Sequence, residues 1–336
     1  MIIISLQIII LINFILKALL MTNAFIFPGQ GSQKIGMGKD LYDSFPIAKE
    51  VFQEVDDALS LNLSKIIFFG DEEELKLTIN TQPALMTVSF AIVKVIEEMI
   101  GKKLCEIGNF TAGHSLGEYS ALVSSRSLKL YDAAKILRLR GKFMQDAVPL
   151  NVGAMAALIG VDIDIIEKIR AKFVEKNEII DIGNDNSPGQ LVISGHNSVI
   201  DKVVSAHKSL GIKRAIKLTV SAPFHCSLMN KAAEDMEKFI YDLEVSSPEL
   251  ILINNVDAVT LTEPIKIKES LIKQISKTVR WRESIQKMND LGVNNFIELG
   301  AGNVLSGLVK RINKKVETLS IQNTNDIENY INTLER

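Results

Sequence analysis

The sequence predicts an α/β fold in which a large domain with a mostly parallel sheet carries a smaller inserted subdomain. Strand-like apolar runs alternate with amphipathic helix-like runs on both sides of a central interval. Inside that interval, residues 149–219, the order changes to strand, helix, two strands, helix and strand, which is typical of a ferredoxin-like subdomain. The length of 336 residues also suits about two domains.

The first part of the large domain, residues 22–148, begins with a strand and a glycine-rich loop, residues 28–33 (Pro-Gly-Gln-Gly-Ser-Gln). Thr81, Gln82 and Pro83 have the character of a cap and first turn, so we expect a long helix to begin there. In chain order, the periodicity predicts a strand over 24–27, a helix over 47–59, a helix from Thr81 to Ile100, a strand ending at Ala112 and, after the next helix, a helix over 130–145.

The inserted subdomain is assigned to residues 149–219. Its expected strands cover 152–161, 179–184, 190–194 and 215–219, and its helices cover 165–175 and 199–210. Alternating α/β patterning resumes afterwards, with strands over 250–254 and 295–298. We therefore assign residues 220–336 to the large domain together with 22–148.

Residues 1–21 differ in composition from the rest of the chain, since Met1–Leu20 are almost entirely Ile, Leu and Phe. Their length suits a membrane-spanning helix. They lack the basic region and small-residue cleavage site of a secretory signal. Because a complete strand begins just after Met21, we interpret residues 1–21 as an apolar extension upstream of the true start, with a membrane anchor as the alternative. We accordingly expect a cytoplasmic protein with no membrane partner.

The composition argues against several classes of partner and cofactor. A formal net charge of −2 offers no general attraction for nucleic acid. The two cysteines and four histidines show neither a disulfide framework nor zinc-binding spacing, so we expect no metal and interpret both cysteines as buried apolar filler. Hydrophobic residues at 47% and charged residues at 23% fit an ordinary globular protein.

Residues 113–117 (Gly-His-Ser-Leu-Gly) form a Gly-x-Ser-x-Gly motif between a strand-like and a helix-like segment. The flanking glycines permit the sharp turn that exposes a serine hydroxyl. Downstream, Leu116, Tyr119 and Leu122 recur at helical spacing. The N-terminus of that helix would point N–H groups at an oxyanion beside the serine. The motif therefore predicts a nucleophile elbow at Ser115.

A nucleophilic serine needs a base and an oxyanion hole. His225, in a proline-containing loop, is the best base candidate because its ordinary pKa of about 6.5 suits proton transfer at neutral pH. No acid is evident as its orienting partner, and a backbone carbonyl would serve. The N–H groups of Gln30 and Leu116 would form the oxyanion hole. A phosphate cradle at residues 29–31 is disfavoured because no Gly-Lys-Ser/Thr sequence follows.

Arg138 and Arg140 lie on the second helix after the elbow strand and face different sides of it, so at most one enters the cleft. Arg140 is either a solvated arginine near Gly141 or a bidentate clamp for a substrate carboxylate. The sequence alone leaves both interpretations open.

Together these segments resemble the malonyl-CoA:acyl-carrier-protein transacylase family from Thr22 to about Ile321. The motifs that carry the resemblance are residues 27–33 (Phe-Pro-Gly-Gln-Gly-Ser-Gln), 81–84 (Thr-Gln-Pro-Ala), 113–119 (Gly-His-Ser-Leu-Gly-Glu-Tyr), 140–141 (Arg-Gly), 186–190 (Asn-Ser-Pro-Gly-Gln), 223–225 (Pro-Phe-His) and 298–300 (Glu-Leu-Gly). The resemblance implies an α/β-hydrolase-like large domain with a ferredoxin-like insertion. Ala301 departs from the proline of many relatives, which we expect to alter loop rigidity and not chemistry.

The resemblance also implies residue roles. Ser115 would be the nucleophile and His225 the base, oriented by the backbone carbonyl of Gln274. The N–H groups of Gln30 and Leu116 would form the oxyanion hole. Two further residues would set acyl specificity. Arg140 would bind the malonyl carboxylate, and Phe224 would disfavour methylmalonyl.

The implied activity is ping-pong transfer of a malonyl group from malonyl-CoA to the phosphopantetheine thiol of an acidic acyl carrier protein, supplying fatty-acid synthesis. The resemblance implies no cofactor beyond these substrates, and we expect a monomer. A basic cluster would suit the acidic partner, although a solvated helix terminus explains the same residues: Lys310, Arg311, Lys314 and Lys315.

Two alternatives remain. A thioesterase or esterase would use the same elbow, although simple hydrolysis needs neither an arginine clamp nor an inserted subdomain. A membrane-anchored binding protein would instead use residues 1–20.

Overall fold

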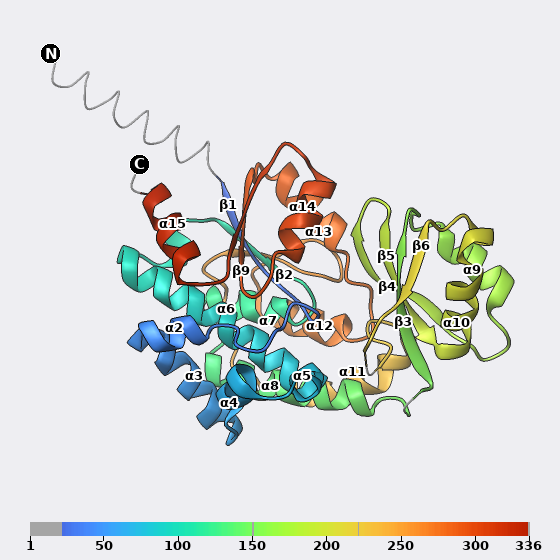
Figure 1. Cartoon of the computed structure of the whole chain (residues 1–336), viewed down its shortest axis with the longest axis horizontal. Coiled ribbons are helices and arrows are strands. Elements are labelled where there is room, and N and C mark those ends of the chain that lie inside the picture. The colour runs from blue at the N-terminus through green and yellow to red at the C-terminus, as the bar shows by residue number, and fades with distance from the viewer. Residues whose placement is uncertain (1–21, 150, 221, 335–336) are drawn as a thin grey trace, which may run out of the picture.

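The computed structural model describes residues 22–149, 151–220 and 222–334 of the chain. It has two sheets, a six-stranded one ordered β10-β9-β1-β2-β7-β8 and a four-stranded one ordered β4-β5-β3-β6 (Figure 1). The predicted mixed α/β class with a mostly parallel main sheet is confirmed. The apolar extension, residues 1–21, lies outside the described residues. Among the helices that are described, none is long and apolar enough to cross a membrane.

The main sheet is parallel except at one edge. Its strands are β1 (Asn23–Phe27), β2 (Phe110–Gly113), β7 (Ile251–Ile253), β8 (Thr260–Leu261), β9 (Asn295–Leu299) and β10 (Glu317–Ile321). The central strand β1 pairs in parallel with β2 and β9, whereas β8 runs antiparallel to β7. The side chains of β1 alternate between two cores: Phe25 and Phe27 point into one, and Ala24 and Ile26 into the other. Both faces of the sheet are therefore covered.

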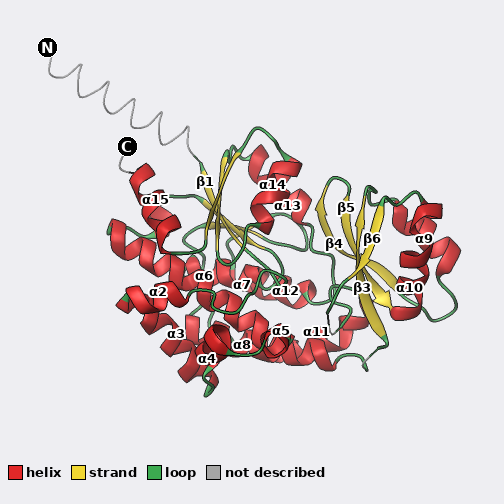
Figure 2. Cartoon of the chain, in the orientation of Figure 1, coloured by secondary structure: helices red, strands yellow, loops and turns green. Residues whose placement is uncertain are grey.

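Helices form a layer on each face of the main sheet (Figure 2). The larger core contains side chains from α2 (Lys39–Ser44), α3 (Pro46–Leu59), α4 (Leu63–Phe69), α5 (Glu72–Lys76), α6 (Thr78–Ile100), α7 (Gly117–Ser124), α8 (Leu130–Asp146), α11 (Asn230–Tyr241), α12 (Pro264–Gln274) and α15 (Thr324–Leu334). The smaller core contains side chains from α13 (Trp281–Asp290) and α14 (Val304–Ile312). Short 3-10 turns cover Leu104–Glu106, His207–Leu210 and Ser227–Met229.

The long helix α6 begins earlier than its capping signal predicts. The Leu77 carbonyl already accepts the N–H groups of Asn80 and Thr81, so the helix starts at Thr78 and Pro83 lies inside it. Close packing by α8 supports this start, because a Cβ on Gly141 would lie 2.7 Å from the Cα of Ile79. The expectation that the helix opens at Thr81 is therefore wrong by one turn.

The inserted part contains β3 (Gly153–Ile159), α9 (Ile165–Phe173), β4 (Ile180–Ser187), β5 (Gln190–His196), α10 (Asn197–Ala206) and β6 (Arg214–Lys217). Its strands are antiparallel, and α9 and α10 share an apolar core with them. This order of elements matches the predicted ferredoxin-like arrangement, while the exact boundaries of 149–219 stay a prediction. Backbone hydrogen bonds between β4 and Val279 join this sheet to the large domain, with the Asp185 N–H donating at 2.9 Å. The site described next lies at this junction.

Candidate active site

The Gly-x-Ser-x-Gly motif forms the turn between β2 and α7, at the carboxyl end of the parallel sheet. Ser115 has a φ of +55°, in the left-handed region that side chains rarely occupy. A Cβ on Gly113 would lie 1.8 Å from the carbonyl carbon of Gly117, and one on Gly117 would lie 2.3 Å from the Phe27 oxygen. Both glycines are therefore required for α7 to pack closely against the ends of β1 and β2.

One buried amide holds this turn at both ends. The Ser115 N–H donates to Asn255 Oδ1 at 2.7 Å, and Asn255 Nδ2 donates to the Gly113 carbonyl at 2.7 Å. Asn255 is fully buried and follows β7. No role for this residue is predicted from the sequence. Its position just beyond the carboxyl end of a predicted parallel strand, where sites in such sheets form, is the signal that could have found it.

Ser115 Oγ lies 2.8 Å from His225 Nε2, and His225 Nδ1 lies 2.7 Å from the Gln274 carbonyl oxygen. Because a carbonyl only accepts, Nδ1 carries the proton and Nε2 is free to accept from the serine hydroxyl. Burial, with the charge of Arg140 nearby, lowers the pKa of His225 to about 3. The imidazole is therefore a neutral hydrogen-bond acceptor at neutral pH.

Gln30 and Leu116, whose backbone N–H groups are the predicted oxyanion hole, both line the same cavity as Ser115. Neither of these N–H groups donates to another group among the described residues. The glycine-rich loop packs against the elbow, since a Cβ on Gly29 would lie 2.7 Å from the His114 carbonyl oxygen. The Gln30 side chain is fixed by Thr78, whose Oγ1 lies 3.1 Å from its Nε2. The assignment of these two N–H groups to an oxyanion hole stays a prediction.

Arg140 is buried in the same site, with 1% of its surface exposed. Its Nη1 donates to Gln82 Oε1 at 2.7 Å, and its Nη2 donates to Gln274 Oε1 at 2.9 Å and to Ser115 Oγ at 3.2 Å. Arg138 points elsewhere and donates to Asn80 Oδ1 at 2.9 Å. Of the two interpretations of Arg140, the solvated helix end is wrong, and the guanidinium faces the serine.

Two glutamines hold this arginine, and neither contact is predicted. Gln82 belongs to the 81–84 motif, which is the only sequence signal for it. For Gln274 the expected role is that of its backbone carbonyl alone. Its side chain also donates from Nε2 to the Ser115 carbonyl at 3.0 Å and to Glu118 Oε2 at 2.9 Å. Gln274 therefore contacts the serine, the histidine and the arginine together.

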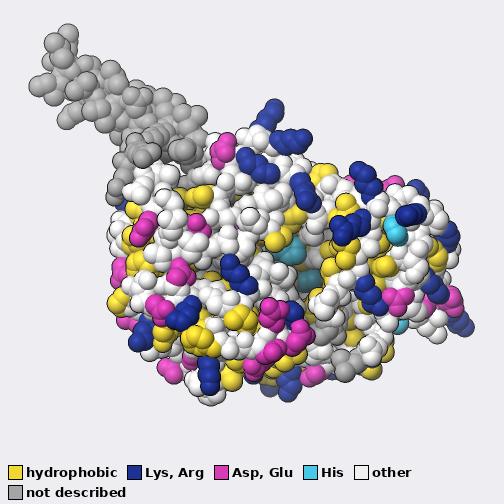
Figure 3. Space-filling model, in the orientation of Figure 1, with side chains coloured by type: hydrophobic (Ala, Val, Ile, Leu, Met, Phe, Trp, Pro, Cys, Tyr) yellow, Lys and Arg dark blue, Asp and Glu magenta, His cyan; other side chains and the backbone are white. Residues whose placement is uncertain are grey.

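A cavity of about 280 Å³ between the two sheets is lined by Ser115, His225 and Arg140, together with Gln30, Gln82 and Leu116. Histidine side chains are visible at the base of the corresponding hollow in Figure 3. The inserted part contributes Met155 and Asn184 to the lining, and Phe224 lies beside His225 with 7% of its surface exposed. The cavity is mainly apolar around one buried cation, which suits a small acyl group with a negative end.

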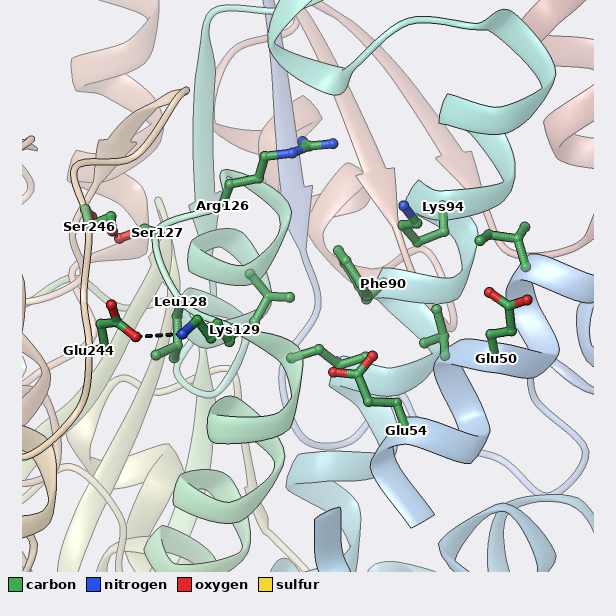
Figure 4. A pocket seen from close by; sticks show the side chains of 14 residues that line it. Glu50, Glu54, Phe90, Lys94, Arg126, Ser127, Leu128, Lys129, Glu244 and Ser246 are labelled. Carbon is green, nitrogen blue, oxygen red and sulfur yellow. Dashed lines mark hydrogen bonds and ion pairs between the residues drawn. The ribbon is translucent and has the colours of Figure 1, made fainter. Parts of the chain in front are cut away.

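A second cavity of about 510 Å³ lies away from the serine, among α3, α6 and the start of α8 (Figure 4). Its three cations are all paired: Lys129 Nζ lies 2.5 Å from Glu244, Arg126 forms two hydrogen bonds with Glu97, and Lys94 Nζ lies 4.0 Å from Glu97. None of the predicted site residues lines it. The structure gives this cavity no link to the chemistry at Ser115.

The predicted basic cluster lies at the C-terminal end of α14 and beyond. Lys310 donates to the Val316 carbonyl, and Arg311 donates to Gln190 of the inserted part. Lys and Arg side chains are visible on this part of the surface in Figure 3. Within the described ranges, no group of three or more His, Cys, Asp or Glu side chains could hold a metal ion.

Comparison with known proteins gives consistent matches along most of the chain. The family model described as "Acyl transferase domain" matches residues 24–328. A protein named "Malonyl CoA-acyl carrier protein transacylase" from Bacillus subtilis (strain 168) is 46% identical over 314 residues, which cover 93% of this chain and 96% of that protein. Among solved structures, an acyl-carrier-protein-S-malonyltransferase from Bartonella henselae superposes with a TM-score of 0.90 at 45% identity, covering 94% of this chain and 100% of that one.

A further solved structure contains a type II PKS acyl-carrier protein in complex with its malonyl-transacylase. This chain resembles it with a TM-score of 0.88 at 38% identity, covering 93% of this chain and 99% of that one.

Proposed function

The chain belongs to the malonyl CoA-acyl carrier protein transacylase family of acyl transferases, and from this premise we propose which of its residues perform the transfer. The protein is an acyltransferase that moves a malonyl group from malonyl-CoA to acyl carrier protein in fatty-acid synthesis. One observation supports the residue assignment above all. Ser115 Oγ lies within hydrogen-bonding distance of both His225 Nε2 and the buried Arg140, so nucleophile, base and carboxylate-binding cation meet in one cavity.

In the first half-reaction Ser115 Oγ attacks the thioester carbonyl carbon of malonyl-CoA while His225 Nε2 takes the hydroxyl proton. The carbonyl oxygen becomes an oxyanion, which the N–H groups of Gln30 and Leu116 stabilise. When the intermediate collapses, the carbon–sulfur bond breaks and His225 returns the proton to the CoA sulfur. A malonyl ester on Ser115 remains.

In the second half-reaction the phosphopantetheine thiol of the carrier protein gives its proton to His225 and attacks the ester. The same two N–H groups stabilise the second oxyanion. The bond from Ser115 Oγ to the acyl carbon then breaks, and the serine oxygen recovers the proton from His225. Because the Gln274 carbonyl holds Nδ1–H throughout, one tautomer of the imidazole serves both half-reactions.

Acyl selectivity follows from the buried guanidinium. A malonyl carboxylate pairs with Arg140 in a fork, whereas an acetyl group leaves those donors buried and unpaired. An unpaired charged donor costs roughly 1.5–3 kcal/mol, which is roughly a tenfold to a hundredfold disadvantage for acetyl-CoA. Phe224 narrows the cavity beside His225, and this supports the expected discrimination against the extra methyl group of methylmalonyl.

Transfer and hydrolysis are distinguished by the fate of the acyl group. Incubating the protein with malonyl-CoA and holo acyl carrier protein should yield malonyl carrier protein as the main product, measured by mass spectrometry. Free malonate as the main product, at a rate independent of the carrier protein, would instead favour a thioesterase. The matched variant Ser115→Ala should form neither the ester nor the product.

The carrier protein remains the proposed macromolecular partner, and the basic side chains around Lys310 and Arg311 are its proposed contact. The expectations of a monomer, of a cytoplasmic location and of catalysis without a cofactor stay predictions.

A further inference from the structure

Glu118 is a completely buried carboxyl group in the first turn of α7, beneath the nucleophile elbow. It does not line the acyl cavity. Its Oε2 accepts the Gln274 Nε2 donor at 2.9 Å and the Asn255 backbone N–H at 3.0 Å. Its Oε1 has no partner among the described groups. Burying a carboxyl group in this way is unfavourable, and the mechanism above does not use it.

The two partners of Glu118 are the residues that support the reacting groups. Asn255 holds the Ser115 N–H, and Gln274 holds Arg140 through its side chain and His225 through its carbonyl. Glu118 therefore contacts both supports from below without touching the substrate space.

The orientation of the Gln274 amide decides what Arg140 meets. In the structure Nε2 faces the Ser115 carbonyl and Glu118, so Oε1 faces Arg140 Nη2 at 2.9 Å. Were the amide reversed, an NH₂ group would face a guanidinium that can only donate, and the hydrogen bond would be lost. Glu118 Oε2, which already accepts the Asn255 N–H, offers Gln274 only an acceptor and so favours the observed orientation.

We propose that Glu118 is a positioning residue for acyl selectivity: by accepting from the Gln274 amide, it keeps that amide oxygen on Arg140 and so aims the guanidinium at the malonyl carboxylate. This inference rests on the proposed roles of Ser115 and Arg140. Burial raises the pKa of Glu118 to about 7. A proton on the unpartnered Oε1 leaves Oε2 able to accept, so the positioning operates in both protonation states.

The test compares Glu118→Ala with Glu118→Gln. Alanine removes the acceptor, whereas the glutamine side-chain oxygen can take the place of Oε2. Each variant is assayed for kcat/KM with malonyl-CoA and with acetyl-CoA, using holo carrier protein as acceptor, and for thermal unfolding. Glu298→Gln is the matched control, since Glu298 is equally buried but binds the N–H groups of Leu305 and Ser306 at the start of α14.

We expect Glu118→Ala to lower kcat/KM for malonyl-CoA by roughly tenfold or more, because the Gln274 amide loses one of the acceptors that fix its orientation. We expect kcat/KM for acetyl-CoA to fall by roughly threefold at most. Glu118→Gln and Glu298→Gln should keep the wild-type ratio of the two values.

Equal losses for both acyl groups in Glu118→Ala would mean a merely structural role and overturn the inference. The inference would also be overturned if Glu118→Gln lowered the ratio of kcat/KM for malonyl-CoA to that for acetyl-CoA as much as Glu118→Ala does. Wild-type protein that transfers no malonyl group would instead refute the proposed function itself, so the two failures are distinguishable.

Discussion

Replacement of Arg140 by alanine is the most direct test of how the site selects its acyl group. The guanidinium is buried and is held at its corners by Gln82 and Gln274, so its remaining donors face Ser115 and the cavity. Arg140→Ala removes the cation and leaves the cavity otherwise intact. It should abolish the preference for malonyl-CoA over acetyl-CoA.

The expected size of the effect follows from burial. Removing one partner of a buried ion pair costs about 3–5 kcal/mol, which lowers kcat/KM for malonyl-CoA by roughly 10² to 10⁴. Acetyl-CoA has no carboxylate to lose and no longer meets unpaired donors, so its kcat/KM should rise, by up to roughly tenfold to a hundredfold. The variant also leaves Gln82 Oε1 without a donor, and a small loss of thermal stability is expected.

The assay measures acyl carrier protein product with malonyl-CoA and acetyl-CoA in parallel. Arg138→Ala is the matched control, because Arg138 lies on the same helix but donates to Asn80 and does not line the acyl cavity. A malonyl-to-acetyl ratio within roughly threefold of wild type in Arg140→Ala would refute the reasoning, since a pairing energy of even 1.4 kcal/mol shifts that ratio tenfold. An equal shift in Arg138→Ala would refute it too.

Three further predictions follow from the same geometry. Asn255→Ala should lower kcat for every acyl group by roughly tenfold or more, since the Ser115 turn loses its two hydrogen bonds to the Asn255 side chain, and equal acetyl and malonyl losses in the transfer assay would check this. Because the pKa of His225 is held at about 3, kcat/KM should stay constant as the pH falls from about 7.5 to about 5.5. An ordinary histidine pKa of about 6.5 would instead lower kcat/KM roughly tenfold over this range, and such a drop would contradict the prediction. Gly117→Ala should lower the melting temperature and the activity together, since its Cβ would lie 2.3 Å from the Phe27 oxygen, and Gly307→Ala, with open space around it, is the control for a calorimetric measurement.

Local sequence patterns are enough to predict much of the fold and the nucleophile. The elbow is predictable because its glycines and the helical period after Ser115 are contiguous in the chain. The inserted part is predictable because its hydrophobic residues recur with the spacing of strands in some short segments and with the spacing of helices in others. The edge strands β8 and β10 are missed, since β8 has only two residues and β10 has only two apolar residues, Leu319 and Ile321.

The supports of the site depend on contacts that local periodicity does not encode. Asn255 meets Ser115 across 140 positions of sequence, and Gln274 meets Arg140 across 134. Only the tertiary structure shows that the Asn255 backbone N–H and the Gln274 side-chain amide both donate to Glu118. The early start of α6 is missed for a related reason, because the close approach of Gly141 from another helix stabilises the turn before Pro83.

The left-handed backbone at the two reacting residues has a consequence for engineering. Ser115 and His225 have φ values of +55° and +59°. That conformation costs a side chain roughly 1–2 kcal/mol, and glycine avoids the cost. Glycine at either position should therefore relax the backbone while removing the chemistry. Directed evolution for heat resistance without an activity screen is thus expected to replace these two residues by glycine early. Stability and turnover must therefore be selected together.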